Sequence, residues 1–171
     1  YMEPVENLRD KAYSVGALSV VATDPFASVL LKPPGSYGAD IVTAEGQPLG
    51  VPVSFGGPYV GLFTCKKEYV RQLPGRVVGK TVDSNGRTAY VLTLQTREQH
   101  IRRERATSNI CTSTDLIGLM TTVYSALLGK EGIKEVALLC DQKSHFAASL
   151  IGQLPGSTLH LDGVFFPDVA A

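Results

Sequence analysis

The chain has 171 residues, of which 44% are hydrophobic and 19% charged, and its formal net charge at pH 7 is zero. This composition is typical of a soluble globular protein with enough chain for a sizeable core. Because the charges balance, no global field attracts nucleic acid, an anionic membrane or an acidic substrate, and any charge-based function must come from a local patch.

The cysteines and the amino terminus exclude several classes of protein. Cys65, Cys111 and Cys140 are widely spaced, and no Cys/His cluster has the spacing of zinc ligands, so we expect reduced thiols and no metal site. No apolar run reaches the about 18 residues of a membrane-spanning helix. The amino terminus also lacks a signal-peptide pattern. We therefore expect a cytoplasmic protein.

The first 65 residues predict an α/β alternation. Apolar spacing indicates a helix over 4–15, and a continuous apolar run predicts a strand over 17–23, covered on both faces as in a parallel sheet. Further strands are expected over 39–43 and 59–65. Asp24 follows the first strand at its carboxyl end, where open α/β sheets place their ligands.

The rest of the chain predicts a hairpin followed by helices. A short amphipathic helix is expected over 66–72, and a β-hairpin over 80–94 turns at the sequence DSNG. A helix over 115–128 begins at a cap of Ser113 or Thr114 and ends at Gly129. Its buried stripe is expected to be Leu116, Met120, Val123 and Leu127. A second helix is expected over 131–151 and a strand over 159–166.

The two ends of the sequence indicate part of a longer protein. Tyr1 precedes Met2, the chain opens within an α/β alternation, and it stops just after a predicted strand. We interpret residues 1–113 as the second half of a large α/β domain. Residues 114–171 then comprise a linking helix and the start of a smaller domain.

The first candidate for chemistry is the glycine-punctuated loop of residues 46–57. Glycines let a backbone approach a phosphate and expose amide donors to it. The spacing fits neither common nucleotide-binding motif. The alternative is a tight, buried crossover whose glycines serve packing alone, and the residues favour that interpretation.

The second candidate is the segment 97–112, REQHIRRERATSNICT. Its arginines can clamp a carboxylate or phosphate through bidentate hydrogen bonds. The alternative is a solvated or interface segment in which they pair with Glu98 and Glu104. Binding of nucleic acid is disfavoured, since the patch is short and has no interleaved aromatic residues.

Two long strings in these regions resemble a known family. They are GADIVTAEGQPLGVPVSFGGPYVGLFTCKKEYVRQLPGRVVGKTVD, from residue 38, and LTLQTREQHIRRERATSNICT, from residue 92. Both are similar to the amino-terminal half of the glycine dehydrogenase (decarboxylating) P-protein of the glycine cleavage system. The form EGQPLG resembles the bacterial version in which the two halves are separate subunits, this being subunit 1.

The resemblance implies an α/β protein of pyridoxal-phosphate fold type I, the aminotransferase-like architecture. It implies an enzyme that uses pyridoxal 5'-phosphate to decarboxylate glycine and passes the aminomethyl group to the lipoyl arm of H-protein. In this family only the second half carries the lysine that holds the cofactor. The resemblance therefore also implies a lysine-bearing partner, subunit 2.

Aligning the Pro and Gly-Gly-Pro positions of the two halves places Gln47 where the lysine would be. Asp24 resembles the acid that binds the pyridine nitrogen, and without the lysine we interpret it as a relic. No catalytic or cofactor-binding residue is then expected in this chain. The interface or shared cavity is expected to use Arg97, His100, Arg102, Arg103, Thr107, Ser108 and Asn109.

The leading hypothesis is thus a fragment of the non-lysine subunit of glycine decarboxylase, inactive alone and partnered by subunit 2. The alternative is a non-catalytic binding or scaffold module derived from a fold type I enzyme. Apolar surface left exposed by missing regions predicts self-association of the fragment.

Overall fold

The computed structural model describes residues 5, 7–110, 114–159 and 165–166. By its internal contacts the chain divides into two compact units. We call residues 1–64 with 114–171 the sheet unit and residues 65–113 the hairpin unit. These units rest on contacts within this chain alone, so the expected division at residue 113 into a large and a small domain stays a prediction.

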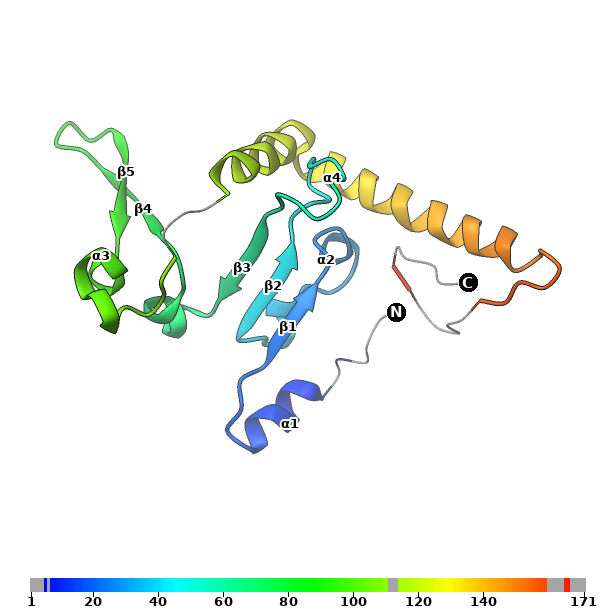
Figure 1. Cartoon of the computed structure of the whole chain (residues 1–171), viewed down its shortest axis with the longest axis horizontal. Coiled ribbons are helices and arrows are strands. Elements are labelled where there is room, and N and C mark those ends of the chain that lie inside the picture. The colour runs from blue at the N-terminus through cyan, green and yellow to red at the C-terminus, as the bar shows by residue number, and fades with distance from the viewer. Residues whose placement is uncertain (1–4, 6, 111–113, 160–164, 167–171) are drawn as a thin grey trace. The chain divides into compact units, whose positions relative to one another are not determined.

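The sheet unit is built on a three-stranded sheet in the order β1-β2-β3. Strand β1 (Val20–Thr23) runs parallel to β2 (Ile41–Glu45), with Val20 opposite Ile41 and Thr23 opposite Ala44. The third strand, β3 (Gly61–Cys65), points the opposite way in Figure 1. All three predicted strands are confirmed, and each begins two or three residues later than predicted.

Short helices flank these strands. Helix α1 (Leu8–Ser14) precedes β1 and is shorter than expected, and the one-turn helices α2 (Ala27–Leu30) and η1 (Pro34–Tyr37) lie between β1 and β2. Buried Asp40 fixes the start of β2, because its carboxylate accepts hydrogen bonds from the Tyr13 hydroxyl at 2.6 Å and the Ser19 amide at 2.8 Å. One charged side chain thereby ties α1 to both parallel strands.

The long helix α4 (Asp115–Ile151) packs against α2 (Figure 1). Thr114 is its N-cap residue, but the Thr114 side chain makes no capping hydrogen bond. Ser113, the other predicted cap, lies outside the described residues. Gly129 breaks the helix with φ 61° and ψ −172°, which confirms two helices that meet at this glycine. Most of the predicted strand over 159–166 also lies outside the described residues, and Phe165 and Phe166 are not in a strand.

The predicted buried stripe of the first half of α4 is wrong for this chain. Leu116 is 70% exposed, Val123 48% and Leu127 82%, and Met120 is half-buried. The helix instead turns buried Thr121 and its half-buried neighbours inward, namely Ile117, Tyr124 and Leu128. This stretch of helix carries apolar residues on all sides, so their spacing does not specify which side packs against the rest of the chain.

Burial in the sheet unit is shallow. Among the residues that the structure describes, the buried apolar side chains are Phe26, Ala27, Ala39, Val51, Ala137 and Ala148, and four of these six are alanines. Strand β1 alternates between exposed and half-buried residues, with Val20 59% exposed. The expectation that both faces of β1 are covered is therefore wrong for the described residues, which leave the face that carries Val20 exposed.

The hairpin unit contains β4 (Val77–Val82) antiparallel to β5 (Thr88–Thr93), which confirms the predicted hairpin and its turn at residues 83–86. The carboxylate of Asp83 shapes the turn by accepting hydrogen bonds from the amides of Asn85 and Arg87. The predicted helix over 66–72 is a 3₁₀ helix, η2 (Lys67–Gln72). Three single turns follow the hairpin: η3 (Gln95–Arg97), α3 (Gln99–Arg102) and η4 (Arg103–Arg105).

Candidate functional site

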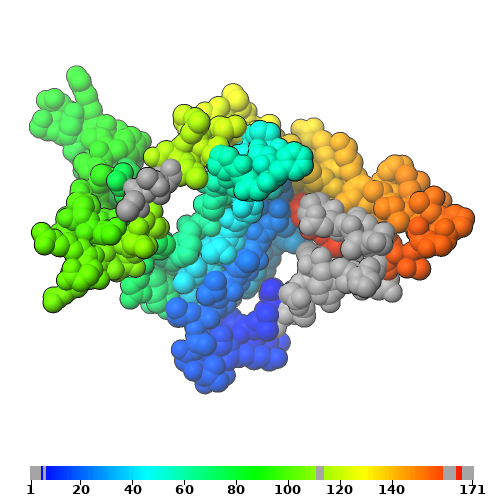
Figure 2. Space-filling view, viewed as in Figure 1, coloured from blue at the N-terminus to red at the C-terminus, as the bar shows by residue number. Residues whose placement is uncertain are grey.

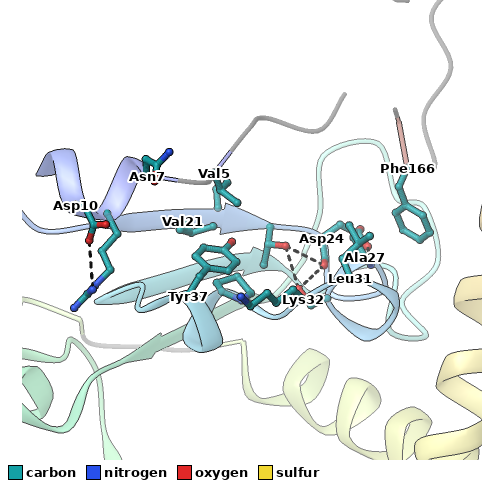
Figure 3. A pocket seen from close by; sticks show the side chains of 15 residues that line it. Val5, Asn7, Asp10, Val21, Asp24, Ala27, Leu31, Lys32, Tyr37 and Phe166 are labelled. Atoms are coloured by element: carbon teal, nitrogen blue, oxygen red, sulfur yellow. Dashed lines mark hydrogen bonds and ion pairs between the residues drawn. The ribbon is translucent and has the colours of Figure 1, made fainter. Parts of the chain in front are cut away.

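A cavity of about 770 Å³ opens in the sheet unit at the carboxyl end of β1 (Figure 3). Its lining includes the strand residues Val21 and Thr23, then Asp24, Ser28, Lys32 and Tyr37. The volume falls within the range of small-molecule sites, and the end of a parallel strand is where open α/β sheets bind ligands. The sequence predicted a ligand site at this strand end because Asp24 follows the strand there.

The carboxylate of Asp24 is used by the fold itself. Its Oδ1 accepts hydrogen bonds from the amides of Phe26, at 2.8 Å, and Ala27, at 2.9 Å. Two of the amides that the first turn of α2 leaves without helical partners are thereby satisfied. Asp24 thus has a structural role that does not need a cofactor.

Lys32 and Tyr37 line the same cavity and were not among the predicted site residues. Burial raises the pKa of the Tyr37 phenol above its usual value. Both residues belong to the sequence KPPGSYG, whose prolines and glycines indicated only a turn. The sequence did hold a signal for these two residues. Lys32 and Tyr37 stand in a proline-rich turn that follows the strand at whose end a ligand was expected.

The first half of the glycine loop of residues 46–57 packs closely on its neighbours. A Cβ on Gly46 would lie 2.6 Å from Val60, and one on Gly50 would lie 2.6 Å from the ring of Tyr124 in α4. Figure 2 shows this loop, coloured cyan to green, lying against the first half of α4. At these two positions packing requires glycine, in agreement with the favoured interpretation. The second half of the loop differs from it, because residues 52–56 are exposed and a Cβ on Gly56 would meet no atom within 4 Å.

Gln47 folds back onto the same loop. Its side-chain Nε2 donates to the carbonyl of Val51 at 2.6 Å, and its backbone amide donates to the Glu45 carboxylate at 2.9 Å. Among the described residues, Gln47 is not one of those that line the cavity beside Asp24. The structure therefore does not bring these two predicted positions into one pocket of this chain.

Arg97 lies in the hairpin unit and is only 7% exposed. Its Nη1 donates to the carbonyl of Leu73 and its Nη2 to that of Gly75 at 2.5 Å, and Nη1 lies 3.1 Å from Oε1 of equally buried Glu98. The guanidinium thus ties the turn before β4 to the segment after β5. Its contacts with Leu73, Gly75 and Glu98 therefore all lie within the hairpin unit.

The other residues of the predicted interface are more accessible. His100, Arg102, Arg103, Thr107 and Asn109 are exposed, and Ser108 is half-buried. The amide of Thr107 donates to the carbonyl of Arg97 at 3.3 Å, so the ends of the intervening segment meet. His100, Arg102 and Arg103 lie within the loop that this hydrogen bond closes, and Ser108 and Asn109 follow it in the chain. The role of these residues at an interface stays a prediction.

Other kinds of site find no support in the part of the chain that the structure describes. No three side chains of His, Cys, Asp or Glu gather there in a way that could hold a metal ion. None of the described helices is long and apolar enough to cross a membrane. Cys111 and His160 lie outside the described residues.

Comparison with known proteins places the chain within one family. The family model for the glycine cleavage system P-protein matches residues 1–169. The chain is 54% identical, over 92% of its length, to a probable glycine dehydrogenase (decarboxylating) subunit 1 of Desulforamulus reducens. It is 53% identical over 96% of its length to the protein of the same name from Chlorobium limicola.

A solved structure agrees with this assignment. The crystal structure of a glycine decarboxylase (P-protein) of the glycine cleavage system, in inhibitor-bound form, superposes with a TM-score of 0.87. It is 48% identical in sequence and covers 91% of this chain, while this chain covers 36% of it. The chain likewise spans 35% and 37% of the two relatives named above. The α/β architecture is therefore that of pyridoxal-phosphate fold type I, and the chain belongs to the family of glycine cleavage system P-proteins.

Proposed function

We propose that this chain forms part of the non-lysine subunit of a glycine decarboxylase. In the assembled enzyme, glycine loses its carboxyl group and the aminomethyl group passes to lipoyl H-protein. Pyridoxal 5'-phosphate, held by the lysine-bearing subunit 2, supplies the electron sink for that step. The supporting observation is the match to proteins named subunit 1 at more than 50% identity across more than 90% of this chain.

The two residues at the expected cofactor positions, Gln47 and Asp24, do not support cofactor binding by this chain. An amide nitrogen cannot form the covalent link that a lysine makes, and the amide of Gln47 is occupied by the Val51 carbonyl. The acid at the expected pyridine position, Asp24, uses its Oδ1 to accept hydrogen bonds from two amides at the start of α2. We therefore assign no cofactor chemistry to these residues, and their proposed part is to shape the partner's surroundings.

A direct test mixes the chain with pyridoxal phosphate and follows its absorbance. The proposal expects no shift of the cofactor band with this chain alone and a shift when subunit 2 is added. A shift with the chain alone would refute the proposal. In that event Lys32→Ala is the diagnostic variant, since Lys32 is the lysine that lines the cavity beside Asp24, and Lys130→Ala is its exposed control.

Pairing with subunit 2 is tested separately by size-exclusion chromatography of the two chains together. Co-elution in a complex is the expected result. If the chains elute separately at micromolar concentration, the result supports the alternative, namely a non-catalytic module derived from a fold type I enzyme. We also propose that both chains are cytoplasmic.

A further inference from the structure

The three asparagines of the chain differ in the residue that follows each of them. Asn7 precedes a leucine and Asn109 an isoleucine, whereas Asn85 precedes the glycine Gly86. An asparagine reacts with its own main chain when the next backbone nitrogen reaches the side-chain carbonyl carbon and closes a five-membered ring. A side chain on the next residue crowds this approach, and glycine has none. Because the preference for Asn85 is covalent, it does not depend on what lies beside the hairpin.

The structure places Asn85 in the turn between β4 and β5 (Figure 1). All of residues 83–87 are exposed. Gly86 has a φ of 76°, and a Cβ built on it would meet no atom within 4 Å. Within the described part of the chain, the carboxamide of Asn85 makes no hydrogen bond, so its carbonyl carbon is open to attack.

The folded turn holds the reacting nitrogen back. The Gly86 amide donates a hydrogen bond to the Asp83 carbonyl at 3.0 Å. The Asp83 carboxylate accepts two more, from the backbone amides of Asn85 at 2.8 Å and Arg87 at 2.9 Å. The Gly86 nitrogen must leave its partner before it attacks, so the reaction starts from molecules in which the turn is open. Two-stranded hairpins are marginally stable, and exposed turns open locally at small cost.

We propose that Asn85 is a self-modification site, that it reacts when the turn opens, and that its conversion to isoaspartate loosens the hairpin. This inference does not rest on the proposed function. The Gly86 nitrogen gives its proton to hydroxide and forms a bond to Cγ of Asn85. The bond from Cγ to the side-chain nitrogen then breaks, and that nitrogen takes a proton from water and leaves as ammonia.

The cyclic imide that remains takes up one water molecule and opens at either of its carbonyls. One opening gives aspartate and the other gives isoaspartate. The overall change is therefore asparagine and water to an acid and ammonia, and no electron is transferred. In isoaspartate the main chain runs through the former side-chain carbon Cγ of Asn85, so the turn is one carbon longer and the α-carboxylate is free.

Both changes act on contacts that hold the turn. The new carboxylate stands near the Asp83 carboxylate, and like charges at this distance repel. The longer main chain also separates the ends of the turn, where the Asp83 amide donates to the Arg87 carbonyl at 2.8 Å and Val82 lies opposite Thr88. Because turn length fixes the register of a hairpin, the strand pairing nearest the turn should loosen first.

The test incubates the purified chain in neutral and in mildly alkaline buffer and follows it by peptide mapping with mass spectrometry. The peptide that contains Asn85 should gain the mass difference between NH2 and OH and separate into two isomers, while Asn7 and Asn109 keep their amides. The rate should rise in proportion to hydroxide concentration. An isoaspartyl methyltransferase with labelled S-adenosylmethionine then measures isoaspartate. Asn85→Gln is the matched control, and it should take up far less label because glutamine must close a six-membered ring.

Two variants test the turn. Asp83→Ala removes two hydrogen bonds of the turn and should speed the reaction of Asn85 about tenfold. After most of Asn85 has reacted, peptides from β4 and β5 should exchange hydrogen faster than in the fresh chain. Freshly purified Asn85→Asp adds the charge without lengthening the main chain, so it should exchange more slowly than the aged chain. Circular dichroism confirms that each variant folds.

Four results would each overturn this inference. They are an Asn85 amide that lasts as long as those of Asn7 and Asn109, equal labelling of the aged chain and Asn85→Gln, an unchanged rate in Asp83→Ala, and unchanged exchange of the hairpin after ageing. None of these results bears on the proposed function, which is tested by the cofactor absorbance and by pairing with subunit 2.

Discussion

Replacing Arg97 with methionine should destabilise the hairpin unit severely. The variant keeps most of the side-chain volume but removes the donors to the Leu73 and Gly75 carbonyls, and it leaves Glu98 charged and 7% exposed. Breaking a buried ion pair by removing one partner costs about 3–5 kcal/mol. Because whole domains are stable by only about 5–15 kcal/mol, a unit of 49 residues should lose most of its protection.

Hydrogen exchange followed by mass spectrometry measures this loss locally. Peptides from the hairpin unit should exchange faster in Arg97→Met, while peptides from β1 and β2 should change little. The matched control is Arg87→Met at the hairpin turn, where the side chain is exposed and the expected effect is within about 0.5 kcal/mol.

A double variant, Arg97→Met/Glu98→Leu, separates the buried charge from the lost hydrogen bonds. Removing both charges takes away the penalty of an unpaired buried carboxylate, so the double variant should recover part of the protection lost in the single one. The reasoning is refuted if Arg97→Met exchanges no faster than Arg87→Met, or if the double variant is less protected than the single variant.

Three further outcomes follow from individual contacts. Gly50→Ala should cost about 1–3 kcal/mol more than Gly16→Ala in urea unfolding, because both glycines have positive φ but only Gly50 lies against Tyr124. Since burial raises the pKa of Tyr37 in the folded state, the unfolded chain loses this proton first as pH rises. Stability should then fall above about pH 10 more steeply than in Tyr37→Phe, and equal slopes would contradict this. Leu127→Lys, at a leucine 82% exposed, should reduce self-association in sedimentation velocity, and an unchanged average mass would count against an apolar origin.

The secondary structure was largely predictable because its signals are local. The sequence DSNG fixes the hairpin turn through the Asp83 side chain, and the positive φ of Gly129 separates two helices where the apolar pattern breaks. Which side of a helix faces the chain is not a local property when apolar residues surround it. For that reason Leu116 and Leu127 were expected to be buried and are exposed.

The candidate site was predictable only in part. Arg97 was grouped with the accessible arginines because composition does not reveal burial, and the carbonyls of Leu73 and Gly75 that hold it lie more than 20 residues earlier. The whole-chain charge of zero also concealed that ten of the 16 lysines and arginines but only four of the 16 acidic residues lie in the hairpin unit, whose boundaries depend on long-range contacts. A charge count in windows of about 50 residues would have found this asymmetry.

The break at Gly129 has a consequence for how the chain tolerates changes in length. In a continuous helix each added residue rotates everything beyond it by about 100°. An insertion between residues 130 and 137 would therefore carry Ala137 and Ala148, 0% and 5% exposed, away from the side on which they are buried. At Gly129 the backbone has already left helical geometry, with ψ at −172°. The helical phase is set anew there, and that position is where this long element can gain or lose a residue without turning its packed face to solvent.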